Sequence, residues 1–333
     1  MITLVELIAV INRKNALPIL RLLETPGVGP AKVRSILEWT KQKGMEPEEL
    51  LTSEENLLRM LSVSQMEALR DNYDTVFNKW YKLNDMEVTF LTSFDDGYPR
   101  SLRSSFGEKA PPLIMALGNI SLLDVTSVGF CGSRKASDKG LATANDCAKQ
   151  LATSEVNIIS GYAAGVDMTT HKAALASGGT TTIVLAEGIL NFRIKRELAS
   201  LWDWQRTVVI SEFLPGITWS VRNAMQRNRT ICALSGAMVL IEAGLTGGSI
   251  EAGRVCLGMG KPLFAPVYEG IPESAVGNRD LLTKGARPLL KSKGKDRANI
   301  KPILEVILAS EKDRMNVGGG SSRVLHQTRM LDL

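Results

Sequence analysis

Serine and arginine residues next to glycine are the part of this chain best suited to binding phosphate. One such group directly follows an apolar run at 128–131, and a pair of arginines around an asparagine precedes another run at 237–241. Glycine lets a ligand approach the backbone amides, and the planar guanidinium pairs with phosphate oxygens. Such contacts position a nucleic-acid backbone without reading its bases. The residues are Gly132, Ser133, Arg134, Arg227, Asn228 and Arg229, together with Gly248 and Ser249 at the start of another expected helix.

A second glycine-rich stretch, residues 160–167, follows the apolar run 156–159. Gly161 lies in a tight strand-to-helix turn, and Lys172 adds a positive charge on the next helix. Asp167 and His171 are four positions apart, so they share a helix face. This pair is more typical of a structural hydrogen bond than of a catalyst, and no G-x-S-x-G motif accompanies it, which argues against a hydrolase triad.

Carboxylates end three of the apolar runs: Glu187, Glu212 and Glu242. Burying an acid at a strand end is costly unless it is paired or functional. One interpretation is that each carboxylate accepts hydrogen bonds from loop amides and organises the loops. The other is that at least one performs acid–base chemistry or binds ribose hydroxyls.

The segment 25–33 connects two expected helices and resembles a helix-hairpin-helix, a module that binds nucleic-acid backbone. Gly27 and Gly29 expose their amides near the positive end of the second helix, Pro30 suits its first turn, and Lys32 adds charge. The alternative is an ordinary helix corner.

The elements that must position these residues are predicted from alternation along the chain. Short apolar runs, rich in β-branched residues, indicate strands buried on both faces. They alternate with amphipathic stretches, which predicts a doubly wound, mainly parallel, Rossmann-like α/β fold whose ligands bind beyond the carboxyl ends of the strands. The runs are 128–131, 156–159, 181–185, 207–210, 237–241 and 262–265, and the expected helices are 138–152, 166–177, 192–202, 219–234 and 249–258.

Four regions follow from these patterns. Residues 1–85 form a small all-helical domain with the helix-hairpin-helix, and 86–126 form a connector with a strand at 113–117. Residues 127–290 form the Rossmann-like domain, and 291–333 form a basic C-terminal helix, at 291–310, with a flexible tail.

Composition narrows the class of protein. The chain has 333 residues and a net charge of +5, and its last fifty residues carry 11 basic and 5 acidic side chains, which suits a polyanionic partner. No apolar run is long enough to span a bilayer, and the start lacks the features of a signal peptide. The four cysteines have no metal-ligand spacing, so we expect no metal and a cytoplasmic location. Neither a dinucleotide nor an ATP motif occurs, so no cofactor is expected.

Together these stretches resemble the DprA/Smf family of DNA-processing proteins over about residues 90–290. The resemblance rests on 132–134, 160–167 with His171, Ser211-Glu212, 227–231, 242–244 with 248–249, Gly277-Asn278 and Gly285-Ala286. It implies an extended Rossmann-like fold that binds single-stranded DNA and helps to load a recombinase. It also implies that Arg134 binds DNA phosphate in a pocket lined or supported by Gly132, Ser133, Arg227 and Arg229, with Lys172 as a further candidate.

The chain departs from the family pattern at several positions. Tyr162 replaces a usual leucine, Glu187 stands where a neutral residue is common, and 191–206 carries Trp202 and Trp204 instead of a Tyr-Pro pattern. The residues after the glycine-rich linker are too few for a C-terminal winged-helix domain.

Three functions remain open from the sequence. The first is a non-enzymatic DNA-binding protein in DNA processing, recombination or phage defence, with single-stranded DNA favoured and a recombinase or a second copy of the chain as further partners. The second is an N-glycosidase acting on DNA or a nucleotide, because the fold resembles that of LOG-type phosphoribohydrolases, with Glu242, Glu187 or Glu212 as the catalytic carboxylate. The third is a sensor of small nucleotides.

Overall fold

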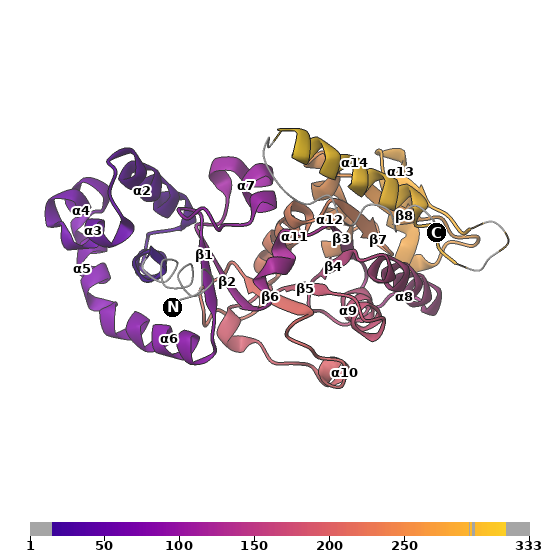
Figure 1. Ribbon diagram of the computed structural model, residues 1–333, viewed down its shortest axis with the longest axis horizontal. Helices are drawn as coiled ribbons and strands as arrows, with labels where there is room; N and C mark the ends of the chain where they lie inside the picture. The colour runs from indigo at the N-terminus through magenta and orange to yellow at the C-terminus, as the bar shows by residue number, and fades with distance from the viewer. Residues whose placement is uncertain (1–14, 293, 295–296, 318–333) are drawn as a thin grey trace. The chain divides into compact units, whose positions relative to one another are not determined.

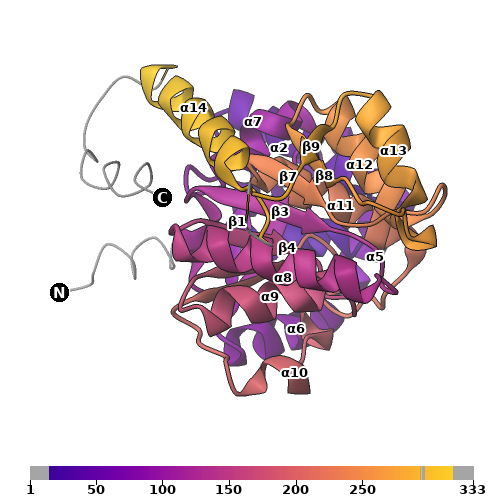
Figure 2. The same cartoon turned by 90° about the vertical axis from the view of Figure 1, so that its right-hand side faces the viewer.

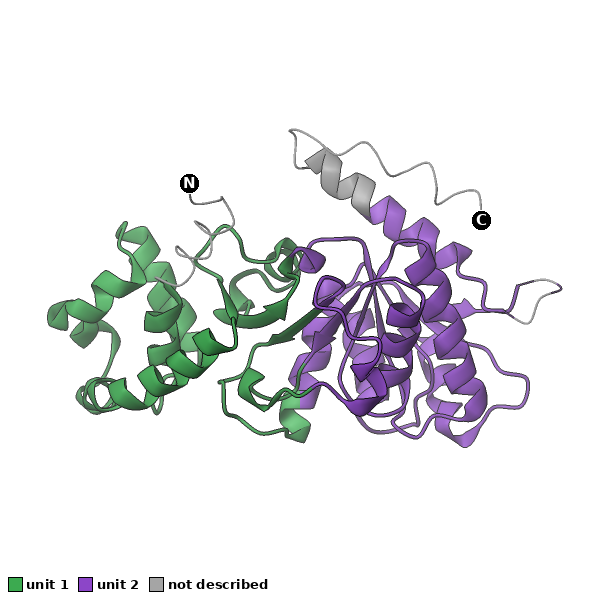
Figure 3. Ribbon diagram, turned by 60° about the horizontal axis from the view of Figure 1, so that its bottom comes forward, with its two compact units in different colours: residues 1–120, 185–193, 208–223 green, residues 121–184, 194–207, 224–333 purple. Residues whose placement is uncertain are grey.

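The computed structural model describes residues 15–292, 294 and 297–317 (Figure 1). Contacts within the chain divide it into two compact units (Figure 3). Unit 1 comprises residues 1–120, 185–193 and 208–223, and unit 2 comprises residues 121–184, 194–207 and 224–333. Because unit 1 takes up two segments from the middle of the chain, the units cut across the four regions predicted from the sequence.

Helices make up most of unit 1. Residues 15–23 are helical, and local signals start several of the helices that follow: Pro30 and Pro47 occupy first turns, and Ser53 and Ser62 accept hydrogen bonds from backbone amides as N-caps. The prediction of short helices in this region is confirmed for the described residues. The helices are α2 (Pro30–Gln42), α3 (Pro47–Thr52), α4 (Glu54–Met60), α5 (Val63–Asp71), α6 (Tyr73–Asp85) and α7 (Arg100–Phe106), with 3-10 turns at Gly107–Lys109 and Ile189–Asn191.

Three antiparallel strands complete unit 1. β2 (Leu113–Gly118) pairs with β1 (Thr89–Thr92) and with β6 (Thr207–Ser211). Met115 lies opposite both Phe90 and Ser211, which fixes the register. The strand predicted at 113–117 is therefore present, whereas its partner β1 was not predicted.

A parallel sheet forms the centre of unit 2, in the order β5-β4-β3-β7-β8-β9. The chain runs outward from β3 to β5 on one side and from β7 to β9 on the other, so the strand order reverses between β3 and β7. Ligands of doubly wound folds bind at such a reversal, beyond the carboxyl ends of the strands. The strands are β3 (Ser127–Cys131), β4 (Asn157–Ser160), β5 (Thr181–Val184), β7 (Ala237–Leu240), β8 (Leu263–Pro266) and β9 (Arg287–Leu289).

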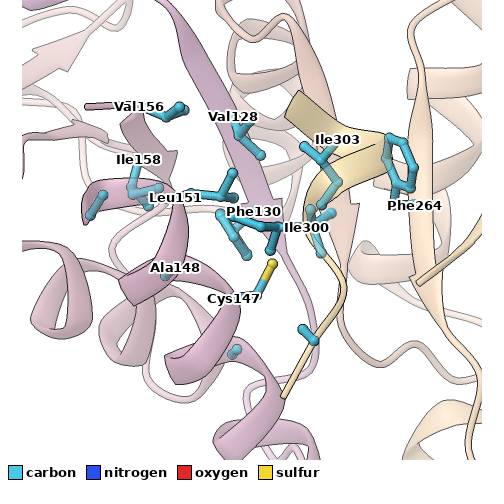
Figure 4. Packing of buried hydrophobic residues seen from close by; sticks show 14 of the residues in the cluster. Val128, Phe130, Cys147, Ala148, Leu151, Val156, Ile158, Phe264, Ile300 and Ile303 are labelled. Carbon is cyan, nitrogen blue, oxygen red and sulfur yellow. The ribbon is translucent and has the colours of Figure 1, made fainter. Parts of the chain in front are cut away.

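Helices cover both faces of this sheet, which confirms the doubly wound α/β class. On one face, Val128 and Phe130 of β3 pack with Cys147 and Leu151 of α8 (Asp138–Thr153) and Ile303 of α14 (Lys301–Val317) (Figure 4). Because alternate side chains of a strand point to opposite faces, the remaining residues of these strands face the other side of the sheet. That side is covered by α11 (Val221–Leu234), α12 (Gly248–Gly258) and α13 (Val276–Thr283). A 3-10 turn at Glu273–Ala275 precedes α13. Figure 2 shows α9 (Val166–Ala176) beside α8.

Two predicted helices are wrong in extent. The helix predicted at 192–202 shrinks to α10 (Arg196–Ala199). Its N-cap Lys195 has an extended backbone, and the Lys195 N–H donates to the hydroxyl of Tyr162, 2.8 Å away. The helix predicted at 291–310 begins only at Lys301. The residues before it pair across the bridge Lys291–Ala298, and the Ala298 N–H donates to Asp146 on α8.

Candidate nucleic-acid interface

The turn that follows β3 lies at the reversal of strand order. The N–H of Ser133 donates to the backbone oxygen of Glu242, 2.9 Å away, and the Ser133 hydroxyl accepts the N–H of Lys135 at 3.0 Å. These bonds tie the turn after β3 to the end of β7. Gly132 is needed for close packing, since a Cβ atom there would lie 2.6 Å from Val166. Arg134 and Lys135 are exposed, so the turn presents two cations to solvent.

The guanidinium of Arg227 is buried behind this turn, and the side chain is only 8% exposed. Its Nη1 donates to the oxygen of Val184 at 3.0 Å and lies 3.8 Å from Asp167. A Cβ atom at Gly161 would come within 1.5 Å of the same nitrogen, so only glycine leaves room for the guanidinium. Burial lowers the pKa of Arg227, while Asp167 opposes the shift and the charge of Arg134 adds to it. Arg134 and Arg227 therefore act on the same region electrostatically.

Arg229 does not share this location. Two residues along a helix correspond to a rotation of about 200°, so Arg229 lies on the opposite face of α11 from Arg227. Arg229 is exposed, whereas Arg227 is buried. Between them, Asn228 donates to the backbone oxygen of Gly248 at 3.3 Å. The structure thus buries Arg227 against Asp167 and Val184 and exposes Arg229 on the opposite face of α11, unlike the single pocket that the family resemblance implied.

The start of α12 is the second glycine turn at this edge of the sheet. Gly247 has a φ of +98°, which favours glycine, and Gly248 is exposed, with only the Met225 sulfur within 4 Å of where a Cβ would be built. Ser249 is half-buried in the first turn. Backbone amides at such a helix start suit an anion.

Asp167 and His171 are both structural, but not as a bonded pair. Asp167 accepts hydrogen bonds from the Ser160 hydroxyl at 2.9 Å and from the Ala163 N–H at 3.1 Å. His171 is fully buried, with Nε2 2.6 Å from the oxygen of Gly161 and Nδ1 2.7 Å from the hydroxyl of Thr181. Burial lowers the pKa of His171 to about 4, so the imidazole is neutral at pH 7.

Lys172, the next residue along α9, is exposed, and its ammonium group can reach a ligand only from the outer face of that helix.

Glu242 is fully buried, and serines surround its carboxylate. One oxygen accepts the Ser137 hydroxyl at 2.5 Å, and the other accepts the Ser137 N–H at 2.8 Å and the Ser274 hydroxyl at 2.6 Å. Because Ser137 is the N-cap of α8, these bonds hold the start of that helix. The geometry supports the interpretation of Glu242 as a residue that organises loops.

The other two strand-end carboxylates, Glu187 and Glu212, belong to unit 1 and are half-buried. The backbone oxygen of Glu187 accepts the Ser211 hydroxyl at 2.7 Å. Tyr98, whose pKa is raised first by burial and then by the charge of Glu212, lies in the same unit.

The predicted hairpin is present in unit 1, where residues 24–29 connect the helix at 15–23 to α2. Gly27 has a φ of +76°, and Gly29 caps α2. Gln65 of α5 braces the turn: its amide nitrogen donates to the oxygen of Gly27 at 2.9 Å, and its oxygen accepts from Lys32 at 2.9 Å. Gly27 and Gly29 are exposed, so their amides can be reached from solvent.

Several absences hold for the described part of the chain. No cluster of His, Cys, Asp and Glu residues there could hold a metal ion. The four cysteines are buried thiols without disulfides. None of the helices there combines the length and the apolar character needed to cross a bilayer.

Sequence reasoning missed Lys195. Its ammonium donates to the backbone oxygen of Tyr162 at 2.6 Å and lies 4.5 Å from the centre of the Tyr162 ring. This contact brings a further cation to the turn that begins at Gly161. The available signal was that both residues fall where the chain departs from the family pattern.

Known proteins resemble this chain over the same region. The family model for DNA recombination-mediator protein A matches residues 89–297. DNA processing protein DprA of Streptococcus pneumoniae is 31% identical over 207 residues, which cover 61% of this chain and 70% of that protein. Protein Smf of Escherichia coli is 33% identical over 180 residues, covering 53% of this chain and 48% of that protein, so the match spans about half of that relative.

Solved structures share the fold. An X-ray structure of DprA from Streptococcus pneumoniae aligns with a TM-score of 0.67 at 24% identity, covering 86% of this chain and 95% of that one. A structure of DNA processing protein A from Helicobacter pylori, described for its single-stranded DNA binding mode, aligns with a TM-score of 0.54 at 23% identity, covering 68% of this chain and 97% of that one.

Proposed function

Because this chain belongs to the DNA recombination-mediator protein A family, we propose that it binds single-stranded DNA through backbone phosphates at the turn after β3. The observation that carries the proposal is the position of 132–134 where the strand order reverses, with Arg134 exposed and Gly132 required for the close packing of the turn. The Helicobacter pylori structure, which concerns a single-stranded DNA binding mode, supports the choice of ligand.

The two arginines have different roles in this proposal. Arg134 is exposed and contacts a phosphate as a planar, charged donor. Arg227 is held by Val184 and Asp167, so it supports the turn and contributes positive potential from beneath. Gly132, Ser133, Gly248 and Ser249 supply backbone and hydroxyl donors. Lys172, Asn228 and Arg229 are further candidates for phosphate contacts, and Arg229, on the opposite face of α11 from Arg227, would meet another part of the strand.

The proposal includes a setting for this binding. The family description, which names DNA recombination, supports a role in DNA processing. Phage defence and a cytoplasmic location are further parts of the proposal, and the four free thiols suit the latter. A recombinase and a second copy of the chain are the proposed protein partners.

Fluorescence anisotropy with single-stranded DNA tests the proposal. We expect Arg134→Ala to weaken binding at least about tenfold, because a charge-assisted phosphate contact is lost. The slope of log affinity against log salt should fall by about 0.7, the value for one phosphate of a single strand. Arg59→Ala is the matched control, because Arg59 is an exposed, ion-paired arginine of α4. Affinity that is insensitive to salt and to Arg134→Ala would refute the proposal.

The glycosidase alternative is less well supported by the geometry. Catalysis would require a carboxylate that reaches the sugar or a water molecule. Both oxygens of Glu242 already accept hydrogen bonds from Ser137 or Ser274, and the side chain is fully buried. No distance or contact favours Glu187 or Glu212 for this task.

A further inference from the structure

A row of aromatic side chains lies along one face of α6 in unit 1. Tyr73, Phe77 and Tyr81 recur every four residues, which places successive rings about 6 Å apart along the helix axis. The ring centres of Tyr73 and Phe77 are 5.5 Å apart with nearly parallel planes, and those of Phe77 and Tyr81 are 4.8 Å apart at a right angle. We call these three residues the aromatic row.

The two outer rings of the row face solvent to an unusual degree. Tyr73 is 47% exposed and Tyr81 is 58% exposed. The buried face of α6 is formed by Val76 and Leu83, so the row is not needed to close the core of the unit. The two exposed rings, with Phe77 half-buried between them, form one continuous aromatic surface on the helix.

The row begins beside the helix-hairpin-helix. Asn72, which precedes α6, donates to the hydroxyl of Thr25 at the start of the hairpin turn and to the backbone oxygen of Arg21, at 3.0 Å each. The guanidinium of Arg21 lies 5.1 Å from the centre of the Tyr73 ring. A nucleic-acid strand whose phosphates meet the amides near Gly27 would therefore pass next to Tyr73.

The shape of the row favours bases over a protein partner. Each ring is followed by an exposed polar residue, in turn Asp74, Asn78 and Lys82, so polar side chains border the row on one side. Stable protein interfaces bury about 800 Å² on each partner, which needs a broader patch. A single file of rings with a cation at one end matches the stacking surfaces on which single-stranded nucleic acids bind.

We propose that the aromatic row is a stacking site for the bases of single-stranded DNA, separate from the phosphate site of unit 2. The inference rests on the proposed function, since it assigns a second contact to the same ligand. Stacking tolerates any base, because every base has a flat π surface. The hairpin would hold the backbone while Tyr73 and Tyr81 hold bases.

The test compares two ligands of equal length, an oligothymidine strand and a strand of abasic sugar-phosphate, with the full chain. Tyr73→Ala combined with Tyr81→Ala should weaken oligothymidine binding about tenfold or more and leave the weaker abasic binding unchanged. Tyr73→Phe with Tyr81→Phe keeps both rings and should bind as the unmodified chain does. Leu58→Ala with Val63→Ala removes exposed apolar groups elsewhere in the unit and is the matched control.

The outcomes separate this inference from the proposed function. If binding is salt-sensitive and depends on Arg134 but not on the two tyrosines, the proposed stacking site is wrong and the proposed function stands. Equal losses for oligothymidine and abasic strands, or equal losses for the Phe and Ala variants, would also overturn it. If the variant with both tyrosines replaced by alanine differs from the unmodified chain in its molecular mass in solution but not in its affinity for DNA, the row is a protein interface instead. Absence of any binding by the unmodified chain would defeat both proposals.

Discussion

Gly161 and Arg227 are in close contact, and the guanidinium of Arg227 leaves no room for a side chain at position 161. The backbone of Gly161 lies against the guanidinium, and the same guanidinium compensates the buried carboxylate of Asp167. Removing one partner of a buried ion pair is costly, because the remaining charge loses its compensation. The family pattern identified both positions, but only the fold shows that glycine is required there by an arginine far away in the sequence.

We predict that Gly161→Ala destabilises the chain by about 1–3 kcal/mol, the usual cost of overpacking. Arg227→Met should cost about 3–5 kcal/mol, since Asp167 is left buried without its partner. The double variant should lose less stability than the sum of the two single losses, because the methyl group introduced by Gly161→Ala no longer meets a guanidinium. Urea unfolding measures all three, and Gly258→Ala, at a glycine with open space, serves as the control. Simple additivity would contradict the contact.

His171 makes stability depend on pH. Its pKa is lowered by burial to about 4 in the folded chain and is 6.5 in the absence of that burial. The unfolded chain therefore binds a proton that the folded chain does not between these values, so stability is complete above pH 6.5 and declines as pH falls toward 4. The decline from this group amounts to at most about 3 kcal/mol.

Nuclear magnetic resonance can observe this histidine directly. The chain has two histidines, so His326→Gln leaves His171 as the single imidazole. We expect its carbon-bound protons to show no titration between pH 7.5 and 5 while the chain stays folded. A midpoint near 6.5 would contradict the burial of His171.

At the scale of elements, the position of the turn after β3 depends on Glu242, which lies just beyond the end of β7. Glu242 caps the start of α8 through Ser137, and its backbone oxygen fixes Ser133. The loop between β3 and α8 and the turn at Ser274 therefore both bond to one buried residue. Burial without a bonded partner would be expensive, and the serines remove that cost.

Glu242→Gln should lower stability by about 2 kcal/mol, because an amide donor would face a hydroxyl or N–H donor and the charge near the helix start is lost. Glu55→Gln, in an exposed pair with Arg59, should change stability by less than about 0.5 kcal/mol. Thermal or urea unfolding measures both variants. The same proteins should release no base from DNA. Base release by the unmodified chain that disappears in a normally stable Glu242→Gln variant would instead support the glycosidase alternative.

At the scale of the whole molecule, each unit contains its own candidate contact for nucleic acid. Unit 1 offers the hairpin with the aromatic row, and unit 2 offers the turns at the carboxyl ends of β3 and β7. The first suits bases and backbone, and the second suits phosphates. A chain with two such contacts can bind a strand more tightly than either contact alone, provided that the strand can reach both.

The amino-acid sequence by itself determined the strands of the parallel sheet except β9, most of the helices and the hairpin, because these follow from local periodicity and from turn residues such as Pro30 and Gly132. The edge strand β9 has no apolar run to mark it, since Arg287 and Pro288 are exposed. It also determined the family, through motifs whose order is visible along the chain. Only the tertiary structure decided that Arg227 is buried while Arg229 is exposed, that Glu242 binds serines, and that Lys195 meets Tyr162. Each of these outcomes depends on residues distant in sequence competing for one hydrogen-bond partner or one small volume, which no local pattern records.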